Sequence, residues 1–282
     1  MAQPHDAESF VEQFAEREDA DKPQADLMLA ATDGAGGGAP GASGGAPGGG
    51  SGASDERPPR PHHYPSRETL DRDMREIKDE VLRMGSLVAS QISLAIDALV
   101  THDAEKATEA IVGDGRINEA QRHIASLITT TIATQQPVAR DLRFLLALDH
   151  VTYELERMGD HAASVAKQAR KLAPEAPLKS YVDLPTMGTL AAEQVRGALR
   201  ALVDLDVEVA REVAAGDDEM DHLYHTIFDE VLRLMRADPG NVERGTRILF
   251  AAHYLERIGD RVTNIAEDVV FLATGDVEDL NP

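Results

Sequence analysis

Two segments of the chain place acidic residues at a spacing that could bind a cation. Glu156 precedes Asp160 by four positions, and Glu256 precedes Asp260 by the same interval one hundred residues later. Residues four apart lie on one face of a helix, so each pair would present two carboxylates side by side. Like charges at this spacing cost about 0.2–0.5 kcal/mol in an isolated helix. The chain repeats this unfavourable arrangement, which therefore needs an explanation.

A glycine lies inside each acidic segment, at Gly159 and Gly259. Glycine in a helix interior costs roughly 1 kcal/mol relative to alanine. Upstream of these segments the two halves also match, at a constant offset of 103 residues. The matching positions are Met84-Gly85, Gln91, Asp103 and Gly113-Asp114 in the first half and Met187-Gly188, Gln194, Asp206 and Gly216-Asp217 in the second. The chain therefore contains two copies of one unit.

Helical periodicity and turn signals place these residues on six long helices. Proline, glycine and glutamine interrupt the pattern at 135–137, 174–177 and 238–240. The expected helices are 68–101, 104–134 and 138–172 in the first copy and 186–204, 207–237 and 242–273 in the second. Short connections make consecutive helices antiparallel neighbours. We predict an all-α protein of two repeated antiparallel three-helix bundles, with the repeats at 66–174 and 178–275.

The apolar stripes of these helices predict how the acidic residues face one another. The third helix of each repeat has a stripe at steps of three and four, from Leu148 to Leu172 and from Ile248 to Leu272. The second helix of each repeat has an aspartate within its own stripe. Folding each antiparallel pair about its turn places Asp114 and Asn118 opposite Glu156 and Asp160, and Asp217 and Asp221 opposite Glu256 and Asp260. Such oxygen ligands between helix axes about 8–10 Å apart suit a divalent or multinuclear centre of Mg²⁺, Ca²⁺, Mn²⁺, Zn²⁺ or iron.

Two other interpretations of the acidic pairs stay open. An acidic chain shows many carboxylate pairs at helical spacing by chance, and Arg157 and Arg257 could neutralise them as salt bridges. A carboxylate-bundle protein that binds or stores iron is the alternative function. Ferritin-like di-iron bundles need Glu-x-x-His on two helices, and this chain has one such match, Glu219 to His222. Oxidative turnover of Fe²⁺ would favour the iron protein.

Composition excludes several other classes of function. The net charge of −22 argues against binding to nucleic acid, which requires clustered Lys and Arg. Without cysteine the chain has no zinc-thiolate site and no cysteine nucleophile, and no Gly-x-Ser-x-Gly motif is present. No catalytic set is apparent, so we expect no enzyme. The acidic bias resembles that of proteins from a high-salt (halophilic) cytoplasm, where screening weakens self-repulsion.

The first 65 residues differ from the rest of the chain. Positions 33–54 are almost wholly Gly, Ala, Pro and Ser, a composition that cannot bury enough surface to offset its ordering entropy. We predict a disordered acidic and Gly-rich extension at 1–65. The sequence has no stretch of about 20 apolar residues and no secretory signal, so we expect a cytoplasmic protein with no membrane span.

The duplicated Glu-Arg-(Met/Ile)-Gly-Asp segments also resemble a known family, the PhoU accessory proteins of the phosphate-specific transport system. Further segments that support the resemblance are Arg83 to Gly85, Asp114 with Asn118, Gln136 to Arg143 and Tyr254 to Asn264. The resemblance covers 68–272. It implies two similar three-helix bundles that bind metal clusters through Glu/Asp-x-x-x-Asp motifs. Asn118 departs from this pattern, so the first site is expected to be weaker.

The same resemblance implies a function. Family members are regulators of phosphate homeostasis and not enzymes. They restrain phosphate uptake. Their implied partners are the ATPase subunit of the phosphate ABC transporter and, in many bacteria, a membrane sensor kinase. A homo-oligomer, such as a dimer, is also expected.

Overall fold

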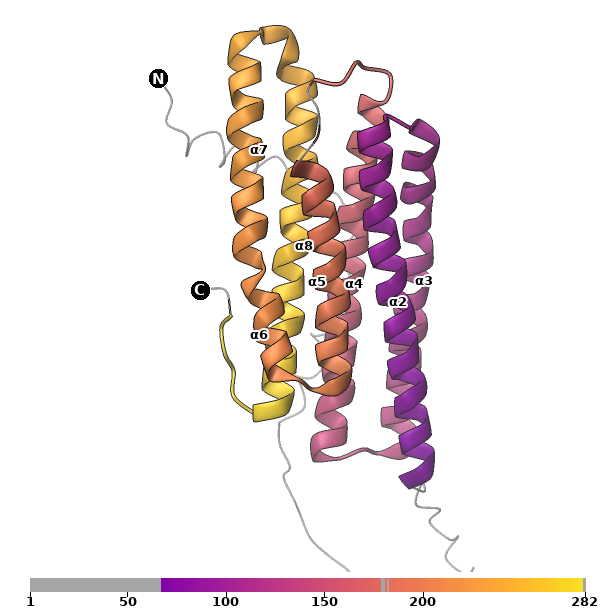
Figure 1. Ribbon diagram of the computed structural model, residues 1–282. Helices are drawn as coiled ribbons and strands as arrows, with labels where there is room; N and C mark the ends of the chain where they lie inside the picture. The colour runs from indigo at the N-terminus through magenta and orange to yellow at the C-terminus, as the bar shows by residue number, and fades with distance from the viewer. Residues whose placement is uncertain (1–66, 179–180, 182, 281–282) are drawn as a thin grey trace, which may run out of the picture. The chain divides into compact units, whose positions relative to one another are not determined.

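The computed structural model describes residues 67–178, 181 and 183–280, so the extension predicted at 1–65 lies outside the described residues. Seven α-helices and one 3₁₀ helix make up the described part of the chain (Figure 1). They are α2 (Arg67–Thr101), α3 (Ala104–Gln135), α4 (Ala139–Leu172), α5 (Asp183–Asp204), α6 (Val207–Ala215), α7 (Asp217–Ala237), η1 (Pro239–Asn241) and α8 (Val242–Thr274). The all-α class is confirmed, and five of the six expected helices begin and end within a few residues of their predicted limits.

The prediction of one unbroken helix over 207–237 is wrong, because the chain turns at Gly216 between α6 and α7. The amide of Gly216 donates to the carbonyl of Val213 at 3.1 Å. A Cβ at this position would lie 2.9 Å from Nε2 of Gln194, which reaches across from α5. At the equivalent Gly113 a Cβ would meet nothing closer than 3.9 Å, and α3 continues through it. The close approach of Gln194 therefore accompanies the break in the second repeat.

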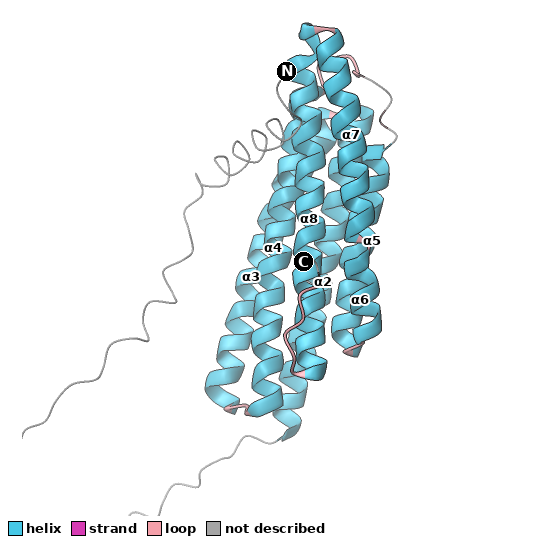
Figure 2. Cartoon of the chain, turned by 90° about the vertical axis from the view of Figure 1, so that its left-hand side faces the viewer, coloured by secondary structure: helices cyan, strands magenta, loops and turns pink. Residues whose placement is uncertain are grey.

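The helices form two three-helix bundles that lie against each other (Figures 1 and 2). α2, α3 and α4 pack together, and α5, the α6–α7 pair and α8 form the second group. α4 packs on α8, and α2 packs on α5. Of the apolar stripes expected in the third helices, every position is buried except Leu272, which is half-buried near the end of α8. These stripes form the core that fixes the register of α4 and α8.

The α2–α5 contact shows that the two repeats are related by an approximate two-fold axis. A Cβ on Gly85 would lie 1.9 Å from Cδ1 of Leu199, and a Cβ on Gly188 would lie 2.4 Å from Cγ1 of Ile96. Gly85 and Gly188 are equivalent positions of the two repeats, as are Ile96 and Leu199. Each glycine thus admits the side chain that the other repeat supplies. A symmetric pair of contacts of this kind defines a self-complementary interface.

The α4–α8 contact follows the same relation but uses different chemistry in its two halves. Glu154 Oε2 lies 3.4 Å from Nη1 of Arg261, whereas the rings of the equivalent His161 and Tyr254 stack with centroids 6.0 Å apart. Glu154 is only 3% exposed. One half of the interface is therefore charged and the other aromatic.

One helix in the described part of the chain, α2, is long and apolar enough to cross a membrane by length and composition. The sequence alone predicts no such segment, because the chain has no uninterrupted run of about 20 apolar residues. Within its most apolar window 56% is buried in the protein, and α2 packs against α3, α4 and α5. A central helix of a bundle has these same properties, so the finding is weak evidence for a membrane span.

Candidate metal centre

The packing of the second helix on the third positions both predicted acidic groups. We call Asp114, Asn118, Glu156 and Asp160 the first cluster, and Asp217, Asp221, Glu256 and Asp260 the second cluster. In the first repeat, a Cβ on Gly159 would lie 3.4 Å from Oδ1 of Asp114 and 3.0 Å from Cδ1 of Ile117. In the second, a Cβ on Gly259 would lie 2.7 Å from Oδ1 of Asp217.

These contacts explain the two glycines that interrupt the acidic segments. Each glycine lets an aspartate of the neighbouring helix approach the backbone of the third helix, between the two acids of that helix. Asp217 is 5% exposed, so its carboxylate lies inside the bundle. Gly159 and Gly259 each cost the helix roughly 1 kcal/mol relative to alanine. In return, each glycine leaves room for an aspartate at the contact between the second and third helices.

Electrostatic repulsion is concentrated in the second cluster. Burial raises the pKa of Glu256 to about 8, and the carboxylates of Asp260, Asp221 and Asp217 add to the shift while Arg257 opposes it. Burial also raises the pKa of Asp260, with a further contribution from Asp221. Four acids from α7 and α8 therefore share one electrostatic environment, as the folding of this helix pair predicts.

Glu256 has little compensation from nearby groups. Its Oε2 atom is buried and accepts no hydrogen bond from the described residues. The ring of His253 lies 3.6 Å from this oxygen. Burial and the charge of Arg257 lower the pKa of His253 to about 4, so the ring is neutral near pH 7. With its pKa raised to about 8, the half-buried carboxyl of Glu256 is largely protonated near pH 7. Ionising it at this site is costly, and a bound cation would offset that cost by stabilising the carboxylate.

The alternative in which Arg157 and Arg257 neutralise the acidic pairs as salt bridges is realised only in part. Nη1 of Arg257 lies 3.3 Å from Asp260, and Nη1 of Arg157 lies 3.9 Å from Asp160. The guanidinium of Arg157 donates instead to the hydroxyl of Tyr153, at 2.7 and 3.2 Å, and packs over that ring. The arginines thus reduce the negative charge at the edge of each cluster, and they lie on the same helices as the acids.

The first cluster differs from the second at Asn118. Its Nδ2 atom donates to Oδ2 of Asp114 at 2.9 Å. This amide occupies the position of Asp221 in the second repeat, so the first cluster has one acidic group fewer and an amide donor where the second has a carboxyl group.

The donor set has the chemistry of a cation site, but the side chains are not arranged as a finished one. Apart from Asn118 every member of the clusters is a carboxylate, and carboxylate oxygens are the ligands of hard divalent cations. Among residues 67–178, 181 and 183–280, no three His, Cys, Asp or Glu side chains are grouped closely enough to hold a metal ion. Coordination would require side-chain rotation within the clusters. His222 and His225 are exposed on α7.

The spacing of residues along one helix did not predict the polar network between the repeats. Besides Arg261, Glu154 faces Asn264, whose Nδ2 lies 3.3 Å from Oε2. His150 Nδ1 lies 2.6 Å from Oδ2 of Asp268. A usable signal was the mismatch between repeats, since Glu154 and His150 align with Tyr254 and Phe250.

Comparison with known proteins gives a consistent result. The family model described as the PhoU domain matches twice, at residues 81–169 and 184–269. A Clostridium acetobutylicum protein named phosphate-specific transport system accessory protein PhoU homolog is 37% identical over 217 residues, which cover 77% of this chain and 99% of that protein. A Xylella fastidiosa protein of the same name is 34% identical over 215 residues, covering 76% of this chain and 91% of the relative.

Solved structures agree with the sequence comparison. The crystal structure of PhoU from Pseudomonas aeruginosa is similar with a TM-score of 0.70 and 33% identity, covering 73% of this chain and all of that one. The structure of the phosphate transport system regulatory protein PhoU from Streptococcus pneumoniae gives a TM-score of 0.69 and 31% identity, with 74% and 99% covered. The similarity therefore extends over both repeats.

Proposed function

This chain belongs to the PhoU family, and from that premise we propose that it is an accessory protein of a phosphate-specific transport system, which lowers phosphate uptake when phosphate is abundant. The observation that carries the proposal is the double match of the family model, to 81–169 and 184–269. The chain also spans 99% of a relative that is named as such an accessory protein.

We propose an adaptor rather than an enzyme. Names of the relatives describe accessory and regulatory proteins. The polar groups at the two clusters are carboxylates and one amide, which suit binding more than nucleophilic chemistry. The direct partner proposed is the ATPase subunit of the transporter, with a sensor kinase as a second partner where one exists. The protein would act in the cytoplasm, as a homo-oligomer such as a dimer.

We also propose that both clusters bind divalent cations and that the second cluster binds more strongly. Support comes from the burial of Asp217 and from Glu256, whose Oε2 atom accepts no hydrogen bond in the described part of the chain. A bound cation would supply positive charge between α7 and α8, where burial and, to a smaller extent, three further carboxylates raise the pKa of Glu256. In the first cluster the amide of Asn118 already binds Asp114. Cation binding would thereby stiffen the contact between the second and third helices.

The role in phosphate uptake is tested in the host by deleting the gene and measuring uptake of radiolabelled phosphate in phosphate-rich medium. We expect uptake to rise in the deletion strain and to return to its original level when the gene is restored. Unchanged uptake in the deletion strain would count against the proposed role.

Cation binding is tested separately by elemental mass spectrometry on protein purified without chelator. The double variant Glu256→Ala/Asp260→Ala should lose the metal of the second cluster. Asp276→Ala, which removes an exposed carboxylate beyond α8, is the matched control and should keep it. Equal metal content in all three proteins would reject the assignment. Repeated oxidation of Fe²⁺ by the wild type would favour the iron-storage alternative, although Glu219 and His222 are both exposed.

A further inference from the structure

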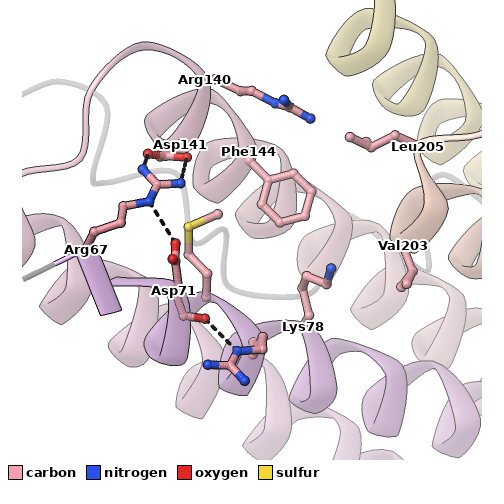
Figure 3. A pocket seen from close by; sticks show the side chains of 10 residues that line it. Arg67, Asp71, Lys78, Arg140, Asp141, Phe144, Val203 and Leu205 are labelled. Atoms are coloured by element: carbon pink, nitrogen blue, oxygen red, sulfur yellow. Dashed lines mark hydrogen bonds and ion pairs between the residues drawn. The ribbon is translucent and has the colours of Figure 1, made fainter. Parts of the chain in front are cut away.

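A basic groove runs beside α2 on this acidic chain. Its first hollow, of about 490 Å³, lies between α2 and the start of α4 and is bounded by the end of α5 (Figure 3). Another hollow, of about 320 Å³, lies between α2 and α5. Val203 lines both hollows, and between them lies a closed apolar gap, lined in part by Lys78 and Leu82, that has no room for a water molecule. We call the two open hollows together the basic groove; their lining residues extend along α2 from Arg67 to Ser86, about 28 Å.

Positive charge dominates the lining. Four cations and two carboxylates line the first hollow, and two cations and one carboxylate line the α2–α5 hollow. Both carboxylates of the first hollow, Asp71 and Asp141, form ion pairs with Arg67. The cations that line the groove without an ion pair in the described part of the chain are Arg75, Lys78, Arg140, Arg196 and Arg200. On a chain with a net charge of −22, such a surface is unusual.

The floor of the groove is apolar. Phe144 lies at its centre in Figure 3, between Lys78 and Arg140, with Val203 and Leu205 across from it. The ammonium of Lys78 is held 5.8 Å from the centroid of the Phe144 ring. Val203 and Leu205 are half-buried at the end of α5. An occupant must therefore offer apolar side chains to the floor and negative charges to the edges.

The shape of the groove favours a helix over a small molecule. Compact ligands are usually enclosed over 70–90% of their surface, whereas both of these hollows are largely open to solvent. An amphipathic helix of about five turns matches a groove of about 28 Å. Acidic residues beside its apolar face would meet the unpaired cations, which gives the charge complementarity that guides association.

We propose that this basic groove is the docking site for an acidic amphipathic helix of the transporter-side partner. The groove lies between α2, α4 and α5, whereas the carboxylate clusters lie between α3 and α4 and between α7 and α8. Docking and cation binding therefore use different surfaces. The proposal rests on the accessory role proposed above, because it assigns the surface through which that role is carried out.

The test measures binding of the full chain to the purified ATPase subunit of the phosphate transporter of the same organism, by biolayer interferometry. The groove variants are Arg75→Glu/Lys78→Glu and Arg196→Glu/Arg200→Glu. The matched control is Arg116→Glu/Arg122→Glu, which reverses two exposed cations on α3. Thermal unfolding of each variant establishes that it is folded; the Arg196/Arg200 pair keeps the test valid if loss of the Lys78–Phe144 contact impairs folding.

We expect each folded groove variant to bind about tenfold more weakly than the wild type, while the α3 control stays within about twofold. Binding of the wild type and the groove variants with equal affinity would overturn the groove as the docking site and leave the accessory role standing. Failure of the wild type to bind would overturn both. Loss of self-association in the groove variants with unchanged partner binding would assign the groove to a second copy of this chain and also overturn the proposal.

The chemistry of the occupant is tested by placing the photo-crosslinker p-benzoyl-phenylalanine at Val203. Mass spectrometry of the cross-linked complex should identify a partner helix with acidic residues beside an apolar face. Cross-linking to a basic segment would contradict the proposed occupant.

Discussion

Replacing Gly259 with alanine tests whether the glycine is present to admit Asp217. Alanine in a helix interior gains about 1 kcal/mol over glycine. Here the added Cβ would lie 2.7 Å from Oδ1 of Asp217, whose side chain is nearly fully buried and has little room to move. Overpacking of this kind costs about 1–3 kcal/mol. The clash should outweigh the gain and leave a net loss of about 1 kcal/mol.

Gly115→Ala is the matched control, since a Cβ at Gly115 of α3 would have nothing within 4 Å. Thermal unfolding should show a melting temperature about 2–4 °C lower for Gly259→Ala and about 2–4 °C higher for Gly115→Ala, because 1 kcal/mol shifts Tm by this amount in a body of about 200 residues. Displacing Asp217 should also weaken Mn²⁺ binding in Gly259→Ala and leave it unchanged in Gly115→Ala.

Stabilisation of Gly259→Ala by as much as Gly115→Ala would refute this prediction. That result would show that Asp217 moves away at little cost and that the glycine has another origin. A destabilised Gly259→Ala variant that binds Mn²⁺ as tightly as the wild type would keep the packing argument and remove Asp217 from the cation site.

Three further predictions concern charge. Asn118→Asp should strengthen Mn²⁺ binding at the first cluster and lower stability without metal, because it replaces the amide that donates to Asp114 with a like charge; equal Mn²⁺ affinity by calorimetry would refute this. Asp268 raises the pKa of His150 above its unfolded value of about 6.5; Glu154 adds to this shift and Arg261 opposes it. The His150–Asp268 pair therefore stabilises the fold fully below about pH 6.5, and this stabilisation is lost as pH rises through the higher pKa of the folded state. Urea unfolding across this window should show a pH slope that is absent in His150→Phe, the variant that copies the residue at 250. Finally, the net charge of −22 predicts that the melting temperature rises between about 0.1 M and 1 M KCl, because the Debye length falls from about 10 Å to about 3 Å over this range and self-repulsion weakens. A melting temperature that does not change with KCl would remove the case for salt adaptation.

Helix identity and the register of the second helix on the third could be predicted from the sequence, since both depend on local patterns. Apolar steps and turn residues fix the helices, and a short antiparallel connection fixes which residues lie level, as the contact of Asp217 with Gly259 shows. The break at Gly216 could not be predicted, because it involves Gln194, a side chain from another helix. Buried Glu154 was missed for a similar reason: the pattern of α4 does not show which face meets α8.

The internal symmetry suggests why only one half of the α4–α8 interface is charged. In a two-fold assembly of identical units, each contact occurs twice, so a glutamate facing an arginine would be present on both sides of the axis. Within one chain the two copies can differ, and here Glu154 and Arg261 align with Tyr254 and His161 of the other half. Paired glycines at Gly85 and Gly188 instead retain the symmetric contact, since each must admit a large side chain from the opposite repeat. Symmetry is thus kept where close packing requires it and lost where polar and aromatic pairs can fill equivalent space.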